Sequence, residues 1–259
     1  IELYDLQTDP DEIMNLAELS EQQQTRTELS EKPDKWREKT DDQWLVRHQL
    51  PMPGEPDSVS SRQASVDDPR GYQSIFNGID LDGWQLRRQE RGGYKVEDGA
   101  LVCPADGGGY VFTEQEYDDF SFVFEFRMEA GANNGIAVRS PLVDEKPAYH
   151  GNEIQLLDNR GYPKKLKPTQ YHGSLYDVAA ARRGALHEAG HWNRQEIRCV
   201  GSRYTVLVND VPILDVDVDA IQDPSVKTKH PGLSRKSGHL GLLGHGSRVE
   251  FRNLRVKEL

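Results

Sequence analysis

The stretch FSFVFEFRM, residues 120–128, constrains the fold of this chain more than any other. Phenylalanine or methionine occupies every second position, whereas Ser121, Glu125 and Arg127 fall at alternate positions, together with Val123. Successive side chains of a β-strand point to opposite faces, so this period of two over nine residues predicts a strand with one strongly apolar face. That face must belong to a hydrophobic core.

Similar short apolar segments follow one another through residues 94–256, separated by turn residues. Asn209-Asp210 predicts a tight hairpin turn, and the alternation slips between Phe251 and Leu254, which predicts a β-bulge. Many short strands with frequent glycine turns predict an all-β sandwich of two antiparallel sheets. We expect the further strands at residues 94–97, 110–113, 135–139, 152–157, 196–200, 204–208, 211–216, 239–243 and 249–256.

The composition changes twice before this region. Residues 1–42 are rich in Glu, Gln, Leu and Lys from about Asn15, which predicts a short helical segment that Pro33 ends or restarts. Residues 43–71 are dominated by Pro, Ser, Asp and Gly without apolar periodicity, so we expect a linker. The sandwich domain is then expected over residues 72–259.

The charge is also uneven along the chain. The net charge is 32 − 43 = −11; residues 1–70 hold 17 acidic and 8 basic residues, and residues 71–259 hold 26 and 24. This balance argues against nucleic acid as a partner, since phosphates need a basic surface. No apolar run reaches about 18 residues, so no membrane span is expected. The chain starts at Ile1 without an initiator Met, so we expect a fragment or a processed form; its oligomeric state stays open.

The segment HEAGH, residues 187–191, matches the H-E-x-x-H pattern of zinc proteases. In those enzymes both histidines lie on one face of a helix and bind zinc. Gly190 lies inside the pattern, and a predicted strand begins at Glu196, so no room remains for the helix that this chemistry needs. We therefore interpret the segment as a loop and expect no zinc.

Three aspartates and two cysteines leave smaller questions open. Asp215, Asp217 and Asp219 share one strand face and could supply oxygen ligands to calcium, although a solvated acidic sheet edge is the favoured interpretation. We therefore expect no metal or cofactor, with calcium as the open alternative. Cys103 and Cys199 allow at most one disulfide, and two small buried side chains are favoured.

Two strands combine apolar and polar alternation in a way that suggests a site. These are NNGIAVRS, residues 133–140, and GNEIQLLDN, residues 151–159. If they pair, Arg139 and Glu153 should lie on the same polar face of the sheet, with Gln155 beside them. The residues alone leave two interpretations: a solvated salt bridge or the floor of a binding site.

The motifs of residues 72–259 resemble, in the same order, those of the 3-keto-disaccharide hydrolase domain family. The resemblance implies a concanavalin-like jelly-roll sandwich that acts on oligosaccharides or glycosides already oxidised to a ketone on the sugar ring. Two positions depart from the family pattern: HGSLYD begins differently, and His191 stands where Glu is common. The motifs are IFNGIDLDGW (75–84), VEDGALV (96–102), YDDFSFVFEFRM, NNGIAVRS, NEIQLLDN, HGSLYD (172–177), GHWN (190–193) and GHLGLLGHGSRVEFRNLRVKEL.

Such a ketone acidifies the neighbouring C–H, so a base can remove the proton and the glycosidic oxygen can leave, after which water adds. The resemblance implies Glu153 as base or acid and Arg139 as its partner or as oxyanion stabiliser. His245 lies between glycines at a strand end and titrates near neutral pH. A turn role stays open for His245 and Asp158, and core packing stays open for Trp192. Sugar contacts are expected from Asn134, Gln155, Asp158, Tyr176 and Trp192.

Residues 1–42 resemble the C-terminal end of sulfatases, through LYDL, a DP.E..NLA segment and a helix ending near Trp36. The sulfatase nucleophile motif, Cys or Ser followed by x-Pro-x-Arg, does not occur, so these residues do not encode sulfate-ester hydrolysis. The two resemblances together predict an exported glycan-degrading protein. The alternatives are a conventional glycosidase with paired carboxylates and a non-catalytic carbohydrate-binding module attached to a sulfatase.

Overall fold

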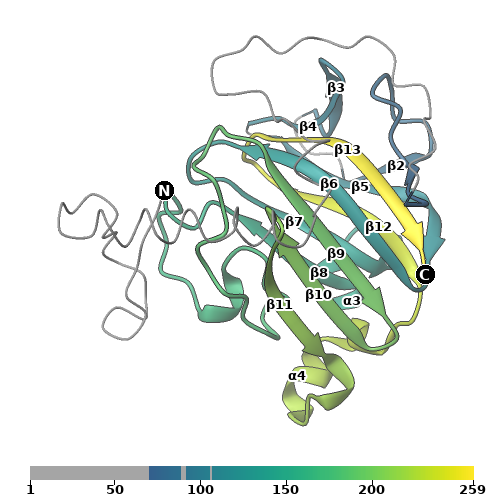
Figure 1. The fold of residues 1–259 in the computed structure, drawn as a ribbon, viewed down its shortest axis with the longest axis vertical. Helices are drawn as coiled ribbons and strands as arrows, with labels where there is room; N and C mark the ends of the chain where they lie inside the picture. Colours follow the sequence, from purple (N-terminus) through teal and green to yellow (C-terminus); the bar gives the residue numbers. More distant parts are fainter. Residues whose placement is uncertain (1–69, 89–91, 106) are drawn as a thin grey trace, which may run out of the picture. The chain divides into compact units, whose positions relative to one another are not determined.

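The computed structural model describes residues 70–88, 92–105 and 107–259, which form two stacked antiparallel sheets (Figure 1). This confirms the predicted two-sheet sandwich. The predicted N-terminal helix and nearly all of the predicted linker fall outside the described residues. None of the described helices has the length and hydropathy to span a membrane.

The larger sheet holds eight strands. They are β1 (Gln73–Ser74), β3 (Lys95–Glu97), β4 (Ala100–Cys103), β6 (Phe120–Met128), β9 (Asn193–Val200), β10 (Arg203–Val208), β11 (Val211–Asp217) and β13 (Val249–Glu258). Their order is β11-β10-β9-β6-β13-β4-β3, and β1 pairs with β13. The predicted strand of phenylalanines, β6, therefore lies near the middle of this sheet.

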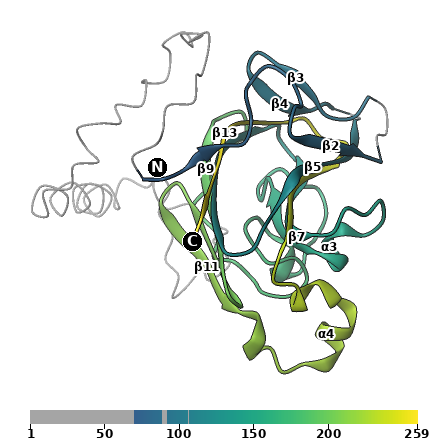
Figure 2. The ribbon, with the colours of Figure 1, turned by 90° about the vertical axis from the view of Figure 1, so that its right-hand side faces the viewer.

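The smaller sheet holds five strands, and one short helix packs against two of them. The strands are β2 (Trp84–Arg87), β5 (Gly108–Tyr117), β7 (Asn133–Ser140), β8 (Asn152–Leu157) and β12 (Gly238–His245), in the order β2-β5-β12-β7-β8. Helix α3 (Pro147–His150) precedes β8, and α4 (Pro224–Lys229) precedes β12. Figure 2 shows β9 and β11 in one layer and β5 and β7 in the other.

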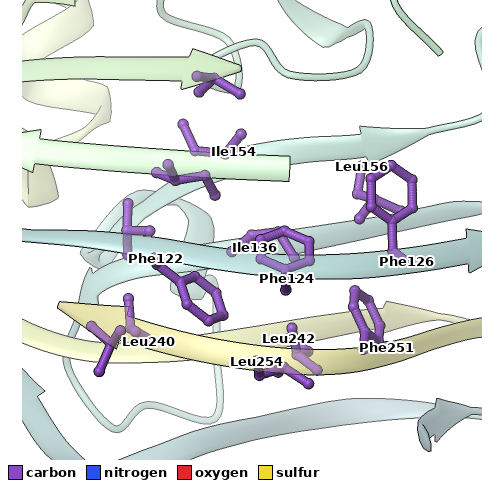
Figure 3. Close-up of a cluster of buried hydrophobic side chains, with 14 of the residues drawn as sticks. Phe122, Phe124, Phe126, Ile136, Ile154, Leu156, Leu240, Leu242, Phe251 and Leu254 are labelled. Atoms are coloured by element: carbon purple, nitrogen blue, oxygen red, sulfur yellow. The ribbon is translucent and has the colours of Figure 1, made fainter. Parts of the chain in front are cut away.

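The core lies between the two sheets. Phe122, Phe124 and Phe126 of β6 are fully buried and face Ile154 and Leu156 of β8 across it (Figure 3). Burying one such side chain stabilises the fold by roughly 1.5–3 kcal/mol. The alternation read in β6 and β8 therefore has the predicted cause: every second side chain fills the core, and the others point outward.

Two local predictions are confirmed by the backbone. Asn209 and Asp210, between β10 and β11, have φ angles of 49° and 65°, as a tight hairpin turn with two left-handed residues requires. In β13 the register to β6 shifts between Arg252 and Arg255, and Asn253 between them has a φ of 54°. This is the predicted β-bulge.

The HEAGH segment is a loop, as predicted, and contains no helix. His187 Nδ1 lies 3.0 Å from the carbonyl oxygen of Trp192, and Glu188 forms an ion pair with Arg160 at 3.3 Å. Without a helix the two histidines do not share the face that zinc chemistry requires.

The acidic run on β11 and the two cysteines also have structural roles. Both carboxylate oxygens of Asp215 accept from Arg203 at 2.6 Å, and Asp217 accepts from the backbone N–H of Asp219 at 3.0 Å. In the described part of the chain, no three His, Cys, Asp or Glu side chains are grouped to hold a metal ion. Cys103 and Cys199 are both buried and free.

Candidate functional site

A pocket of about 280 Å³ opens on the outer face of the smaller sheet. Glu153 and Gln155 of β8, His245 of β12 and Tyr176 line it, so the structure brings four predicted site residues together. We call this site the β8 pocket. The connections before and after β8 supply most of its remaining walls. Its other described lining residues are Arg88, Tyr110, Asn133, Lys146, Pro147, Ala148, Tyr149, Leu157, Tyr162, Leu166, Gln170 and Leu243.

The strand register places these groups on one face. Glu153 lies opposite Ala137, and Gln155 lies opposite Gly135, on the neighbouring strand β7. On its other side, β8 is bonded to residues 173–176: Gln155 N–H donates to Ser174 at 2.9 Å, and Tyr176 N–H donates to the Glu153 carbonyl at 2.9 Å. Tyr176, a predicted sugar contact, therefore lies beside Glu153 in the pocket.

Glu153 is the most unusual of these side chains electrostatically. It is only 4% exposed, and residues 70–88, 92–105 and 107–259 give its carboxyl group no hydrogen-bond or ion-pair partner. Burial alone raises the pKa of Glu153 to about 8, because the ionised form loses its hydration without compensation. At neutral pH the group is therefore mostly a carboxylic acid that can donate a proton.

Two neighbouring titratable groups, His245 and Tyr176, are also uncharged at neutral pH. His245 lies exposed at the rim, yet the pocket walls remove enough water to lower the pKa of its imidazole. Burial raises the pKa of Tyr176, and Gln170 Nε2 donates to its hydroxyl oxygen at 3.3 Å, which leaves the phenolic proton available to a ligand. Environments that push the pKa values of a carboxyl group and an imidazole apart are typical of an acid and base pair.

Gly135 provides the space into which Glu153 extends. A Cβ atom added at this position would overlap Oε1 of Glu153. We therefore expect Gly135→Ala to displace the carboxyl group and to lower kcat/KM about 100-fold, the order expected for a misplacement of about 1 Å. The fold should persist, because the overlapping atoms belong to a flexible side chain. Kinetics with a 3-keto-glycoside would measure the fall in kcat/KM, and circular dichroism would test whether the fold persists.

A double variant separates this effect from general damage. If Gly135 acts only through the carboxyl group, Gly135→Ala should cost little further activity in a protein that already carries Glu153→Gln. Full additivity of the two losses would show that Gly135 matters for another reason.

The predicted pairing of Arg139 with Glu153 is wrong. Arg139 has a φ of 48° and lies where β7 carries one extra residue relative to β12. Such a bulge turns the next side chain to the other face. Arg139 is 1% exposed and donates to the carbonyl oxygens of Asp118 and Gly201 at 3.0 and 2.6 Å and to Asp119 at 2.8 Å. It ties the β5–β6 connection to the β9–β10 connection instead of lining the pocket.

Three further predicted sugar contacts also lie away from the pocket. Asn134 points between the sheets, where its Nδ2 donates to the Tyr94 hydroxyl at 3.1 Å. Asp158 accepts from three backbone N–H groups at 2.8, 3.1 and 3.1 Å and so organises the turn after β8. Trp192 packs against two arginines of the larger sheet, with guanidinium carbons 4.8 and 3.9 Å from its ring centroid. The turn role left open for Asp158 is the one it has, whereas Trp192 is half-buried against these arginines and lies outside the described core cluster.

Apart from Tyr176, which belongs to the HGSLYD motif, sequence reasoning missed the pocket residues that come from connections. Lys146 and Tyr149 precede β8, and Tyr162, Leu166 and Gln170 follow it. Connections have no apolar period, so no pattern could assign these side chains to a face. The available signal was their position, because both segments join the strands that carry the site.

Comparison with known proteins agrees with the motifs. Residues 71–257 match the family described as the 3-keto-alpha-glucoside-1,2-lyase-like domain. A 3-keto-disaccharide hydrolase of Bacteroides thetaiotaomicron is 27% identical, with 78% of this chain and 82% of the relative covered. A candidate glycosyl hydrolase of Parabacteroides distasonis has the same fold: TM-score 0.66, 22% identity, 77% of this chain and 100% of that chain covered. A second from that organism has TM-score 0.55, 20% identity, and 83% and 96% coverage. The chain therefore belongs to the 3-keto-alpha-glucoside-1,2-lyase-like domain family.

Proposed function

We propose that this domain is a carbohydrate-active hydrolase or lyase that cleaves 3-keto-glycosides in the β8 pocket. The observation that carries the proposal is a buried carboxylic acid, Glu153, in the same pocket as a neutral imidazole and a protonated phenol. The family and the relative from Bacteroides thetaiotaomicron support the substrate class.

The groups in the pocket match the needs of an elimination next to a ketone. Neutral His245 takes the proton from the carbon beside the ketone, and the electron pair moves onto the ketone oxygen, where the Tyr176 hydroxyl donates a hydrogen bond. The enolate then re-forms the carbonyl, the glycosidic C–O bond breaks, and Glu153 gives its proton to the leaving oxygen. An unsaturated keto sugar remains, and addition of water completes hydrolysis. Arg139, which lies elsewhere, takes no part.

The pH dependence of the reaction tests these assignments. The acid must be protonated and the base neutral, so kcat/KM should fall as pH rises through about 8, the pKa of Glu153. It should also fall at low pH, below the usual histidine range, because the pKa of His245 is lowered. If Glu153 were the base, the rate would instead rise through pH 8. In the His245→Asn variant, kcat/KM should no longer fall at low pH, because Asn does not titrate.

The decisive experiment compares two substrates of the same shape. The protein is incubated with a nitrophenyl 3-keto-glucoside and with the unoxidised glucoside, and nitrophenol release is followed. We expect release from the keto compound only, with exchange of the proton beside the ketone when the reaction runs in heavy water. Binding of either compound without release would contradict the proposal and would identify a carbohydrate-binding module instead.

A conventional glycosidase has less support. That chemistry needs two carboxyl groups facing the glycosidic bond, and Glu153 is the only carboxylate among the described residues that line the pocket. Equal hydrolysis of the oxidised and unoxidised glucosides would nevertheless favour it. The exported location and the sulfatase-like tail of residues 1–42 stay predictions from resemblance.

A further inference from the structure

Lysines are concentrated in the two connections that wall the β8 pocket, although the chain as a whole is acidic. Lys146 lines the pocket from the connection before β8. The connection after β8, which supplies the lining residues Tyr162 and Leu166, contains no Asp or Glu over residues 159–172. We define the basic rim as the exposed lysines of these two connections: Lys146, Lys164, Lys165 and Lys167.

Among the residues that the structure describes, the rim lysines differ from most other basic side chains in having no ion-pair partner. Within the described ranges, no ion pair neutralises any of the four. Elsewhere such pairs are common: Arg203 meets Asp215 at 2.6 Å, and Lys229 meets Asp177 at 2.6 Å. Unpaired charges of one sign around a concave site concentrate ligands of the opposite sign.

The pocket interior does not cancel this charge. Glu153, the one described carboxylate that lines it, is mostly protonated at neutral pH. Asp144 beside the rim is paired with Arg87 at 3.6 Å, and exposed Glu145 beside Lys146 offsets one of the four rim charges, so the rim keeps a net positive charge. The pocket volume of about 280 Å³ lies just below the usual range for small-molecule sites, which begins at roughly 300 Å³. It suits one sugar ring, so the leaving portion of a glycoside must extend across the entrance.

We propose that the basic rim binds an oxyanion, a carboxylate or a sulfate, on the leaving portion of the glycoside. This inference rests on the proposed function, because it takes the pocket as the place of the keto sugar. The rim then selects acidic glycosides from neutral ones, while Glu153, His245 and Tyr176 act on the bond that breaks.

Matched substrates test the selection. Three 3-keto-glucosides are compared whose aromatic leaving groups carry a carboxylate, its neutral amide, or a sulfate ester, placed so that the phenol acidity is unchanged. We expect kcat/KM for both anionic compounds to exceed that of the amide about tenfold at low salt, as several exposed charge pairs acting together would give. The preference should disappear in 0.5 M sodium chloride. Preference for one anion alone would identify which oxyanion the rim takes.

Charge-matched variants assign the effect to the rim. The triple variant Lys164→Ala, Lys165→Ala and Lys167→Ala should lose the preference and keep its rate with the amide. The control variant Lys95→Ala, Lys236→Ala and Lys257→Ala removes the same charge away from the pocket and should keep the preference. Equal kcat/KM for anionic and amide substrates, or a preference that survives the rim variant, would overturn the proposal.

Binding measurements separate this proposal from the proposed function. Calorimetry with the unoxidised carboxylate and amide glucosides reports the selection without any chemistry. If no keto-glucoside is cleaved but the carboxylate still binds about tenfold more tightly than the amide, the rim proposal stands as a binding preference and the catalytic one fails. If the protein binds the carboxylate and the amide equally well but cleaves a keto-glucoside, the rim proposal fails and the catalytic proposal stands.

Discussion

Replacing Glu153 by Gln is expected to lower kcat for a 3-keto-glycoside by about 10²- to 10⁴-fold, the range that a positioned proton donor contributes. Gln has nearly the same shape and can still donate a hydrogen bond, but it cannot release a proton to the leaving oxygen. The pocket should therefore bind substrate almost unchanged, so KM should move much less than kcat. Initial rates over a range of substrate concentrations would separate the two constants.

The leaving group offers an internal control for this prediction. A glycoside of an acidic phenol needs little protonation, so Glu153→Gln should slow it much less than a glycoside of an alkyl alcohol. Glu114→Gln, at an exposed position on β5, should leave both rates unchanged. If Glu153→Gln cleaves the alkyl glycoside as fast as the parent, Glu153 is not the proton donor.

The same substitution is expected to stabilise the folded protein at alkaline pH, on the order of 5 kcal/mol. Below about pH 4.5 the carboxyl group is protonated in both the folded and the unfolded chain, so it does not lower the free energy of unfolding. Between pH 4.5 and about 8 the unfolded chain releases its proton while folded Glu153 keeps it, so unfolding becomes more favourable by about 1.4 kcal/mol per pH unit. Above pH 8 both forms are ionised and the penalty is constant. Gln does not titrate.

Urea unfolding of the parent and of Glu153→Gln at pH 5, 7 and 9 would measure this difference. The gap between their free energies of unfolding should widen with pH and then level off, while Glu114→Gln should follow the parent. A gap that does not change with pH would mean that the pKa of Glu153 is ordinary. Together with the loss of activity, the widening gap would show that this group is kept at the expense of stability, as is common in active sites.

The sequence predicts the long strands of the core well and the short strands poorly. Strands such as β6 and β8 have a strict period of two because they are buried on one face, and both were predicted with their observed bounds. β2 and β4 were not predicted. β4 (Ala100–Cys103) is buried on both faces and only four residues long, so it shows neither alternation nor a length that identifies a strand.

The predicted site residues also divide into those whose face follows from strand alternation and those whose face does not. Glu153 and Gln155 follow the alternation of β8, so their common face could be predicted. Arg139 was placed on that face by counting residues, and a bulge invisible in the apolar pattern moved it to the other side. Asn134 shares the inward parity of Ile136, which is also buried, so the period of two already places Asn134 in the core and not in the pocket.

Residues 173–176 have a consequence beyond placing Tyr176 in the pocket. Among the bonded strands of the smaller sheet, β8 comes last, and an unprotected last strand offers its free N–H and C=O groups to other molecules. The backbone bonds from Gln155 to Ser174 and from Tyr176 to Glu153 occupy those groups. The strand with the reactive carboxyl group can thus face an open pocket without offering a template for self-association, and a variant that loosens residues 173–176 should endanger solubility as well as catalysis.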